Sequence, residues 1–419
     1  MVNQFKATVQ PLSMLSPLRN GLLGSAGPPA AVQNGEAVLW RGRAGLAMHR
    51  SLQIAPDHRL ILRAACRRLI HVGDVQATHA LIARHARTRE DPWLIAAELA
   101  VAQILECSPK YLKEGTNLFK SQRYSPAATT ELGAALCMQA YASGATKLAK
   151  RLLRKSLEAP TDNLVAQARW IGTRLGGIEI SSAVWNTPRS YEAWTWRAFV
   201  ASDWSSALRF ARAWVLDEPF SSRAATHATY MARSVNRDYE YAIACAQQVL
   251  VADPNDLMLT NNLVVALAYQ GDLEKAANLC NRLMSAPDAG DAGCTFAATR
   301  GLVAFRAGDV EAGRNFYAEA FRNASRSLKL RVLAHWLREE ARVDPRQVLP
   351  IMDRLMKFAG TRQDSVVQRI LEIARDDGLE SARRESSVIK HGGPDAVDKL
   401  AHSLENDLLP GNAHPAIAL

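Results

Sequence analysis

The chain has 419 residues, of which 48% are hydrophobic and 22% charged, and its formal net charge is +10. This hydrophobic content excludes an intrinsically disordered chain, and the length allows a sizeable buried core. No stretch approaches the roughly 18 uncharged apolar residues that a transmembrane helix needs, so no membrane span is expected.

Residues 1–35 are rich in Gly, Pro, Ser and Ala and show no helical periodicity, so we expect a flexible leader. Its apolar residues are interrupted by Lys6, Gln10, Pro11 and Arg19, which leaves no compact apolar region of a signal peptide. The six cysteines lie far apart and form no CxxC pair, which favours buried, reduced thiols over disulfides or a zinc site. These features predict a cytoplasmic location.

From about Glu36 onward the apolar residues follow a helical period, and alternating strand patterns are absent from the sequence. Prolines recur between the predicted helices, where each can end one helix and begin the next. The sequence therefore predicts an all-α fold.

A helical hairpin repeats along the chain, and an aspartate marks the start of its second helix. The marker residues are Asp74, Asp203, Asp238, Asp272 and Asp309. The last four are spaced 35, 34 and 37 residues apart, and in these four units a small residue follows four positions after the aspartate. We expect the aspartate to cap the second helix and the small residue to let the two helices approach closely. Because one hairpin cannot bury its apolar stripe alone, the hairpins are expected to stack into an α-solenoid.

This pattern resembles the tetratricopeptide repeat (TPR) family, most clearly over residues 188–323. Val264, Thr195 and Cys137 stand where the family usually has small residues, so the units are degenerate. The resemblance implies a right-handed superhelix of stacked antiparallel hairpins. We expect basic, degenerate TPR-like hairpins over 36–187, regular units over 188–323, C-terminal hairpins and a cap over 324–390, and a tail over 391–419.

Signatures of catalysis and of cofactor binding are missing from the sequence. It contains no GxxxxGK[ST], no GxGxxG after a strand, no HExxH and no GxSxG. Five of the ten histidines lie between His49 and His85, but no two of them are four residues apart on a helix. We therefore predict no catalytic residue, no metal ligand and no cofactor.

The TPR resemblance also implies a partner-binding groove, because the first helix of each TPR hairpin lines the concave side. By register, the groove-facing residues are Arg63, Arg67, Tyr141, Arg189, Trp196, His227, Asn261, Asn262, Tyr269 and Arg306. Asn262 resembles in position the asparagine with which the family binds peptide backbone. The complete carboxylate clamp of chaperone-binding TPRs is not reproduced, so an extended peptide or a helix is the expected ligand.

Tryptophan is unevenly distributed, with six of nine between Trp170 and Trp214. Two interpretations stay open for this cluster. The large aromatic residues either fill a loosely packed degenerate repeat or provide an anchor for a ligand, as tryptophan does at binding hot spots.

Positive charge is concentrated in the first part of the chain, where residues 1–160 hold 21 Lys and Arg against 10 Asp and Glu. One predicted helix carries five cations on a single face, namely Lys147, Lys150, Arg151, Arg154 and Lys155. This face is either simply solvated or binds an acidic protein, nucleic acid or an anionic membrane surface.

Three functional hypotheses follow. The first is a non-catalytic TPR adaptor or scaffold that binds a protein or peptide in its groove and regulates or assembles a bacterial-type cytoplasmic complex. The second is a nucleic-acid-associated repeat protein that uses the basic N-terminal surface. The third is the sensor or partner-binding half of an enzyme whose catalytic domain is on another chain.

Overall fold

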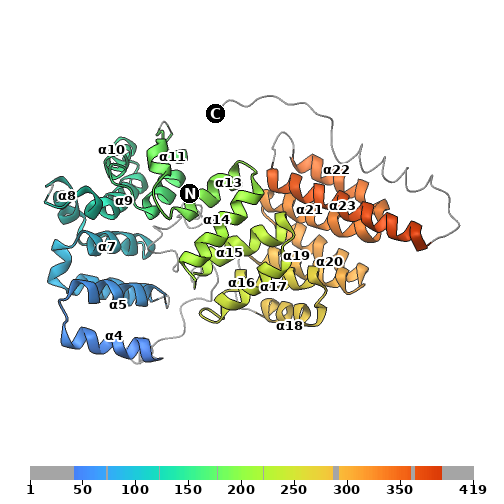
Figure 1. The fold of residues 1–419 in the computed structure, drawn as a ribbon, viewed down its shortest axis with the longest axis horizontal. Coiled ribbons are helices and arrows are strands. Elements are labelled where there is room, and N and C mark those ends of the chain that lie inside the picture. Colours follow the sequence, from blue (N-terminus) through green and yellow to red (C-terminus); the bar gives the residue numbers. More distant parts are fainter. Residues whose placement is uncertain are drawn as a thin grey trace. The chain divides into compact units, whose positions relative to one another are not determined.

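The computed structural model describes residues 42–71, 74–121, 123–176, 178–219, 221–285, 292–359 and 364–388. The expected leader over 1–35 and the tail over 391–419 lie outside these residues. The described part is helical throughout and contains no strand, which confirms the all-α prediction (Figure 1). Within it, no helix is long and apolar enough to cross a membrane.

The chain divides into two compact units, residues 1–225 and 226–419. The boundary falls inside helix α15 (Ser222–Met231) and therefore within the stretch expected to hold regular units.

The described part of unit 1 consists of consecutive helices joined by short turns. These are α4 (Gly42–Ile54), α5 (Arg59–His71), α6 (Val75–Arg84), α7 (Pro92–Ile104), α8 (Leu112–Lys120), α9 (Pro126–Ala142), α10 (Thr146–Ser156), α11 (Asp162–Leu175), α12 (Ser182–Trp185), α13 (Tyr191–Val200) and α14 (Trp204–Asp217). Pairs of neighbours pack as hairpins, with the most extensive contacts between α9 and α10 and between α13 and α14.

Unit 2, residues 226–419, continues the same pattern after a π-helical turn at Ala232–Asn236. Its helices are α16 (Tyr239–Leu250), α17 (Leu257–Gln270), α18 (Leu273–Met284), α19 (Gly293–Arg306), α20 (Val310–Asn323), α21 (Arg326–Val343), α22 (Val348–Ala359) and α23 (Ser365–Val388). Each hairpin from α17 to α22 packs on the next one, whereas α23 packs on α21 and on the π-helical turn. Within each unit, the stacked hairpins confirm the helical-repeat architecture.

The five marker aspartates all cap their helices, as the sequence predicts. Each carboxylate accepts a hydrogen bond from the backbone N–H three residues later, at 2.7 Å from Asp74, 3.0 Å from Asp203, 3.2 Å from Asp238, 3.4 Å from Asp272 and 3.1 Å from Asp309. In the last four units the residue before the aspartate has a positive φ: Gly271 and Gly308 are glycines, but Ser202 and Arg237 are not. The turn geometry is thus kept even where glycine, which adopts it most easily, is absent.

The small residues bring paired helices close together, most clearly between α19 and α20. A Cβ atom added to Gly313 would lie 2.4 Å from Cδ2 of Phe305, and one added to Gly301 would lie 2.8 Å from Cδ2 of Tyr317. Real Cβ contacts are essentially never this short, so a side chain at either position would force the neighbouring ring or helix to shift. The two aromatic rings occupy the space that the missing side chains leave.

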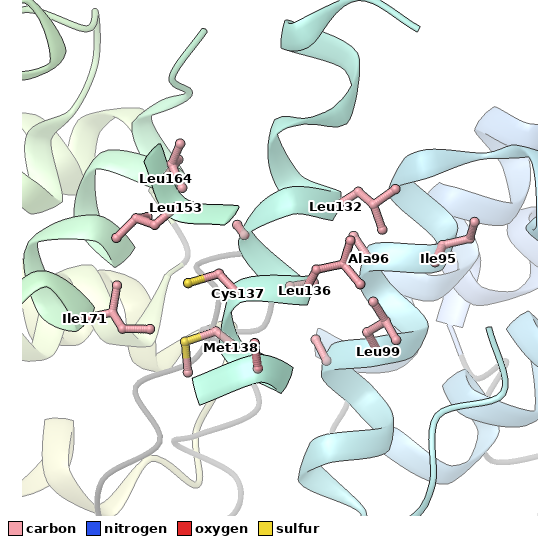
Figure 2. Close-up of a cluster of buried hydrophobic side chains, with 14 of the residues drawn as sticks. Ile95, Ala96, Leu99, Leu132, Leu136, Cys137, Met138, Leu153, Leu164 and Ile171 are labelled. Atoms are coloured by element: carbon pink, nitrogen blue, oxygen red, sulfur yellow. The ribbon is translucent and has the colours of Figure 1, made fainter. Parts of the chain in front are cut away.

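The core of unit 1 lies on both sides of α9. Leu132 and Leu136 of α9 face Ile95 and Leu99 of α7, whereas Cys137 lies on the opposite side (Figure 2). Because α9 is covered on two sides, its sequence is apolar nearly all round, and burial of each large side chain contributes roughly 1.5–3 kcal/mol.

Five of the six cysteines are free and buried, in agreement with the predicted core thiols, but Cys107 is exposed after the end of α7. Burial raises the pKa of the Cys66 and Cys137 thiols to about 12. These two thiols therefore stay protonated and unreactive at neutral pH.

Candidate functional site

In α5, the predicted groove residues Arg63 and Arg67 both lie against one tryptophan. Their guanidinium carbons are 5.6 Å and 5.1 Å from the ring centroid of Trp93. Arg63 also donates to both carboxylate oxygens of Asp91, at 2.8 Å and 3.0 Å, and Asp91 in turn caps α7 through the backbone N–H of Trp93. Arg63 is thus used within the fold, while Arg67 is exposed.

The other groove predictions in unit 1 fall in separate places. Tyr141 packs edge-on against Trp170, with ring centroids 6.4 Å apart. Trp196 packs edge-on against Phe199 at 5.6 Å. Arg189 is exposed and pairs with Asp217 at 3.4 Å. No described contact joins these three residues to Arg63 or Arg67, so the groove predictions of unit 1 do not form one cluster.

Asn261 and Asn262 of α17 are buried, and both bind other parts of unit 2. The side-chain oxygen of Asn262 accepts hydrogen bonds from Nε and Nη2 of Arg233, at 3.0 Å and 2.9 Å. Its amide nitrogen donates to the Thr226 carbonyl and to Oγ1 of Thr229, both at 3.0 Å. Asn261 accepts a hydrogen bond from Oγ1 of Thr299 at 2.7 Å. In this structure the side chain of Asn262 therefore satisfies two N–H donors of the buried Arg233 and is not available to a peptide backbone.

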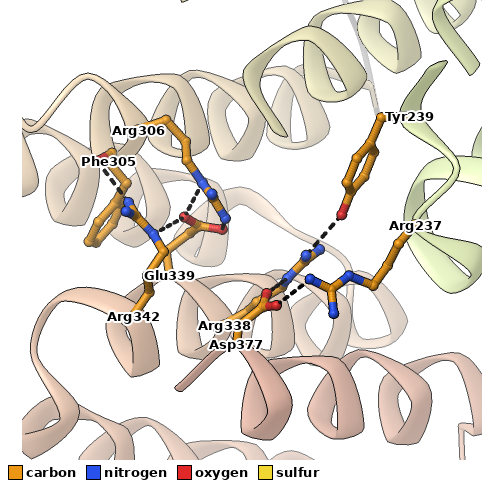
Figure 3. Close-up of polar contacts among 8 residues, drawn as sticks. All are labelled: Arg237, Tyr239, Phe305, Arg306, Arg338, Glu339, Arg342 and Asp377. Carbon is orange, nitrogen blue, oxygen red and sulfur yellow. Dashed lines mark hydrogen bonds and ion pairs between the residues drawn. The ribbon is translucent and has the colours of Figure 1, made fainter. Parts of the chain in front are cut away.

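Tyr269 and Arg306, the next groove predictions, also lie in an internal network. Arg306 forms a bidentate ion pair with the buried Glu339 of α21, with Nε–Oε2 and Nη2–Oε1 distances of 2.8 Å and 3.1 Å (Figure 3). The ring of Tyr269 stacks on that of Tyr239, with centroids 5.1 Å apart. The guanidinium carbons of Arg306 and Arg338 lie 4.7 Å and 4.1 Å from the Tyr269 centroid. Burial raises the pKa of the Tyr269 hydroxyl well above its usual range.

The C-terminal helix α23 completes this network from the far end of the sequence. Asp377 accepts from Nε of Arg338 at 2.8 Å and pairs with Nη2 of Arg237 at 2.9 Å (Figure 3). Arg338 also donates to the hydroxyl of Tyr239, 99 residues away, at 3.0 Å. Arg369 donates to the carbonyl of Val235, 134 residues away, at 3.1 Å. Of the side chains assigned to a partner in unit 2, Tyr269 and Arg306 are therefore bound by the chain's own α21, which α23 in turn contacts through Asp377.

Sequence reasoning missed Arg233, Arg338, Glu339 and Asp377, which hold this network together. The α21 sequence places charged residues beside the buried Leu333 and Leu337, and this pattern could have indicated buried ion pairs. His227, the remaining groove prediction, lies half-buried in α15.

The predicted basic face is present on α10. Lys147, Arg151 and Arg154 are exposed, and Lys150 and Lys155 are half-buried. Lys155 reaches back to Phe119, whose carbonyl accepts from Nζ at 3.3 Å and whose ring centroid lies 4.9 Å from it. Among the described residues no carboxylate forms an ion pair with any of the five, so the face keeps its full positive charge.

Among the described side chains, no group of three or more His, Cys, Asp or Glu is placed to hold a metal ion.

No known family profile matches this chain, and no curated protein matches its sequence. Among solved structures, the TPR domain of P58(IPK) is similar with 10% identity and a TM-score of 0.25, over 86% of this chain and 98% of that chain. The APC/C hetero-tetramer Cut9–Hcn1 is similar with 10% identity and a TM-score of 0.23, over 93% and 98% of the two chains.

Proposed function

We propose that this protein is a non-catalytic helical-repeat adaptor of the cytoplasm that binds a protein partner through unit 1. Stacked hairpins present long, rigid surfaces, which is how repeat proteins gather partners. The uncompensated positive surface of unit 1 is the observation that carries this proposal.

Two exposed arginines of unit 1 lie on aromatic rings and form no ion pair among the described residues. Arg67 lies on Trp93 at 5.1 Å and Arg174 on Trp170 at 3.9 Å, and neither is paired with a carboxylate among the described residues. The α10 face adds five further cations that form no ion pair among the described residues. Arginine and tryptophan are enriched at the energetic centres of protein interfaces, so this surface fits an acidic partner.

Nucleic acid is the second candidate, because the α10 face alone matches a phosphate backbone. The helix is 11 residues long and therefore spans only about 16 Å. Strong binding to nucleic acid relies on neutralising many phosphates, which one short helix cannot do. We therefore favour the protein partner.

Affinity purification of the full chain from its host, with nuclease treatment and mass spectrometry, tests the proposal. We expect specific proteins to be retained by the wild type and lost from the triple variant Lys150→Glu, Arg151→Glu, Arg154→Glu. The matched control reverses three exposed unit 2 arginines, Arg282→Glu, Arg322→Glu and Arg326→Glu, and should retain them.

Loss of every protein after nuclease treatment would favour the second candidate. Binding of a duplex DNA or RNA probe should then weaken steeply between about 50 mM and about 200 mM salt. An equal loss of captured proteins from both triple variants would contradict a specific role of α10.

A further inference from the structure

One hairpin of unit 1 lacks most of its second helix. The helix α12 has four residues, whereas the second helices α10, α14, α16, α18 and α20 have 11, 14, 12, 12 and 14. In regular hairpins the second helix covers the next hairpin, as α18 packs on α19 and α20 on α21. The α13/α14 hairpin is therefore left without this cover on the side that faces α12.

A hollow of about 500 Å³ lies at this place, which we call the α12 hollow. Its lining includes Trp185, Trp194, Arg197, Ser206, Arg209 and Phe210. The rings of Trp194 and Phe210 lie 5.5 Å apart, and Nε1 of Trp194 donates to the Trp185 carbonyl at 2.8 Å. The volume is within the range of roughly 300–1,000 Å³ that is typical of ligand sites.

Two arginines make the hollow positive. The guanidinium group of Arg197 lies 5.0 Å from the Trp185 ring centroid, and that of Arg209 lies 4.9 Å from the Phe210 ring. Both are exposed, and in the described part of the chain neither forms an ion pair. The one acid of the lining, Asp203, caps α14 by accepting from the backbone N–H of Ser206. Two cations thus face one carboxylate that already has a structural role.

We propose that the α12 hollow binds an amphipathic helix of a partner protein that carries acidic residues about one turn apart beside an apolar side chain. This helix takes the place that the second helix occupies in the other hairpins. Its carboxylates pair with Arg197 and Arg209, and its apolar side chain packs on Trp194 and Phe210. The inference rests on the proposed adaptor function and names the chemistry of the partner.

A helix fits better than an extended peptide, because the missing element of the hairpin is itself a helix. An acidic helix fits better than a neutral one, because like-charged arginines in a hollow are stabilised by opposite charge. The aromatic rings also accept a planar base, so single-stranded nucleic acid is the competing occupant that the experiment must separate.

Selection from a phage library of helical peptides tests the proposal directly. Each peptide has roughly 14 residues with a fixed leucine stripe, and its flanking positions are randomised among Glu, Asp, Lys and Arg. The bait is the full chain, with counter-selection on the double variant Arg197→Glu, Arg209→Glu. Both arginines are exposed, so circular dichroism should show that this variant folds like the wild type.

We expect acidic peptides to be enriched and to bind the wild type about tenfold more tightly than the double variant, measured by calorimetry. The unit 2 triple variant Arg282→Glu, Arg322→Glu, Arg326→Glu should bind these peptides as the wild type does, so general charge attraction is controlled. Enrichment without charge preference, or equal binding to the double variant, would overturn the inference. Complete displacement of the peptide by a single-stranded oligonucleotide would overturn it in favour of nucleic acid.

This experiment is independent of the purification from the host. Peptide binding at the α12 hollow without any captured protein would contradict the adaptor function and leave the site standing. Captured proteins that also bind the Arg197→Glu, Arg209→Glu variant would support the adaptor function and place its partner elsewhere.

Discussion

At the scale of single residues, the contact between α19 and α20 depends on glycine. Gly313 lies under the ring of Phe305, which is itself buried and packed against Tyr317 at 5.9 Å. Because both rings are buried, a methyl group at this position must displace a packed ring or push the helices apart.

We predict that Gly313→Ala lowers the free energy of unfolding of unit 2 by about 1–3 kcal/mol. The matched control is Gly172→Ala in α11, where the nearest atom to an added Cβ is 4.0 Å away. Alanine should there stabilise the helix by about 0.5–1 kcal/mol. Urea unfolding of the full chain measures both changes, and effects of the same sign would refute the packing explanation.

At the scale of elements, one acid of α23 lies between two arginines of other parts of unit 2. Asp377 pairs with both Arg338 and Arg237, and Arg338 is almost completely buried. A buried cation that loses its acid is far more costly than an exposed one.

We predict that Asp377→Asn loosens α23 and lowers the stability of unit 2 by about 3 kcal/mol. The neighbouring Asp376→Asn is the control, because Asp376 is only half-buried and its one described ion pair, with Arg375, is long at 3.5 Å. Limited proteolysis within 365–388 should accelerate in the first variant and not in the second. Equal proteolysis in the two variants would show that the Asp377 pairs do not hold the helix.

At the scale of the whole molecule, the two units carry half-buried titratable groups whose pKa values are shifted in opposite directions. In unit 2, burial and the nearby Arg233, Arg338 and Arg331 lower the pKa of His335 to about 3. In unit 1, burial raises the pKa of the Glu131 and Glu218 carboxyls.

The signs follow from proton linkage. The lowered pKa of His335 means that the unfolded chain binds the proton more readily, so its contribution to stability is present above about pH 6.5 and is lost as the pH falls toward 3. The raised pKa values in unit 1 mean that the folded state binds protons more readily. Their contribution is therefore present at acidic pH and is lost as the pH rises through the folded pKa values.

We predict that lowering the pH from about 7 to about 5 weakens unit 2 by about 1–2 kcal/mol through His335 and strengthens unit 1. Hydrogen exchange resolved by peptide, corrected for intrinsic rates, reports each unit separately. The variant His335→Gln should remove most of the change in unit 2. A pH response of unit 2 that persists in this variant would assign it to other groups.

The candidate site was predictable where it depends on neighbouring residues. The capping aspartates and small residues were found because each acts within one hairpin. A cap joins residues three positions apart, and a small residue contacts the other helix of the same hairpin. The α10 face was found for the same reason, since helical spacing alone puts its five cations on one side. The buried state of Asn261, Asn262 and Tyr269 was not predicted, because register within a repeat does not say what covers a groove.

The sequence by itself therefore determined the all-α class, the hairpin unit, its caps and the concentration of positive charge, because these depend on local periodicity and on hydrogen bonds between near neighbours. Only the tertiary structure decided the rest. It divided the chain at 225 and 226, bound Arg306 of the predicted groove to α21, linked α21 to α23 through Asp377, and left the α12 hollow. Such features depend on contacts between distant residues, for example Arg369 and Val235, which are 134 residues apart. Local sequence periodicity does not predict which distant residues come into contact.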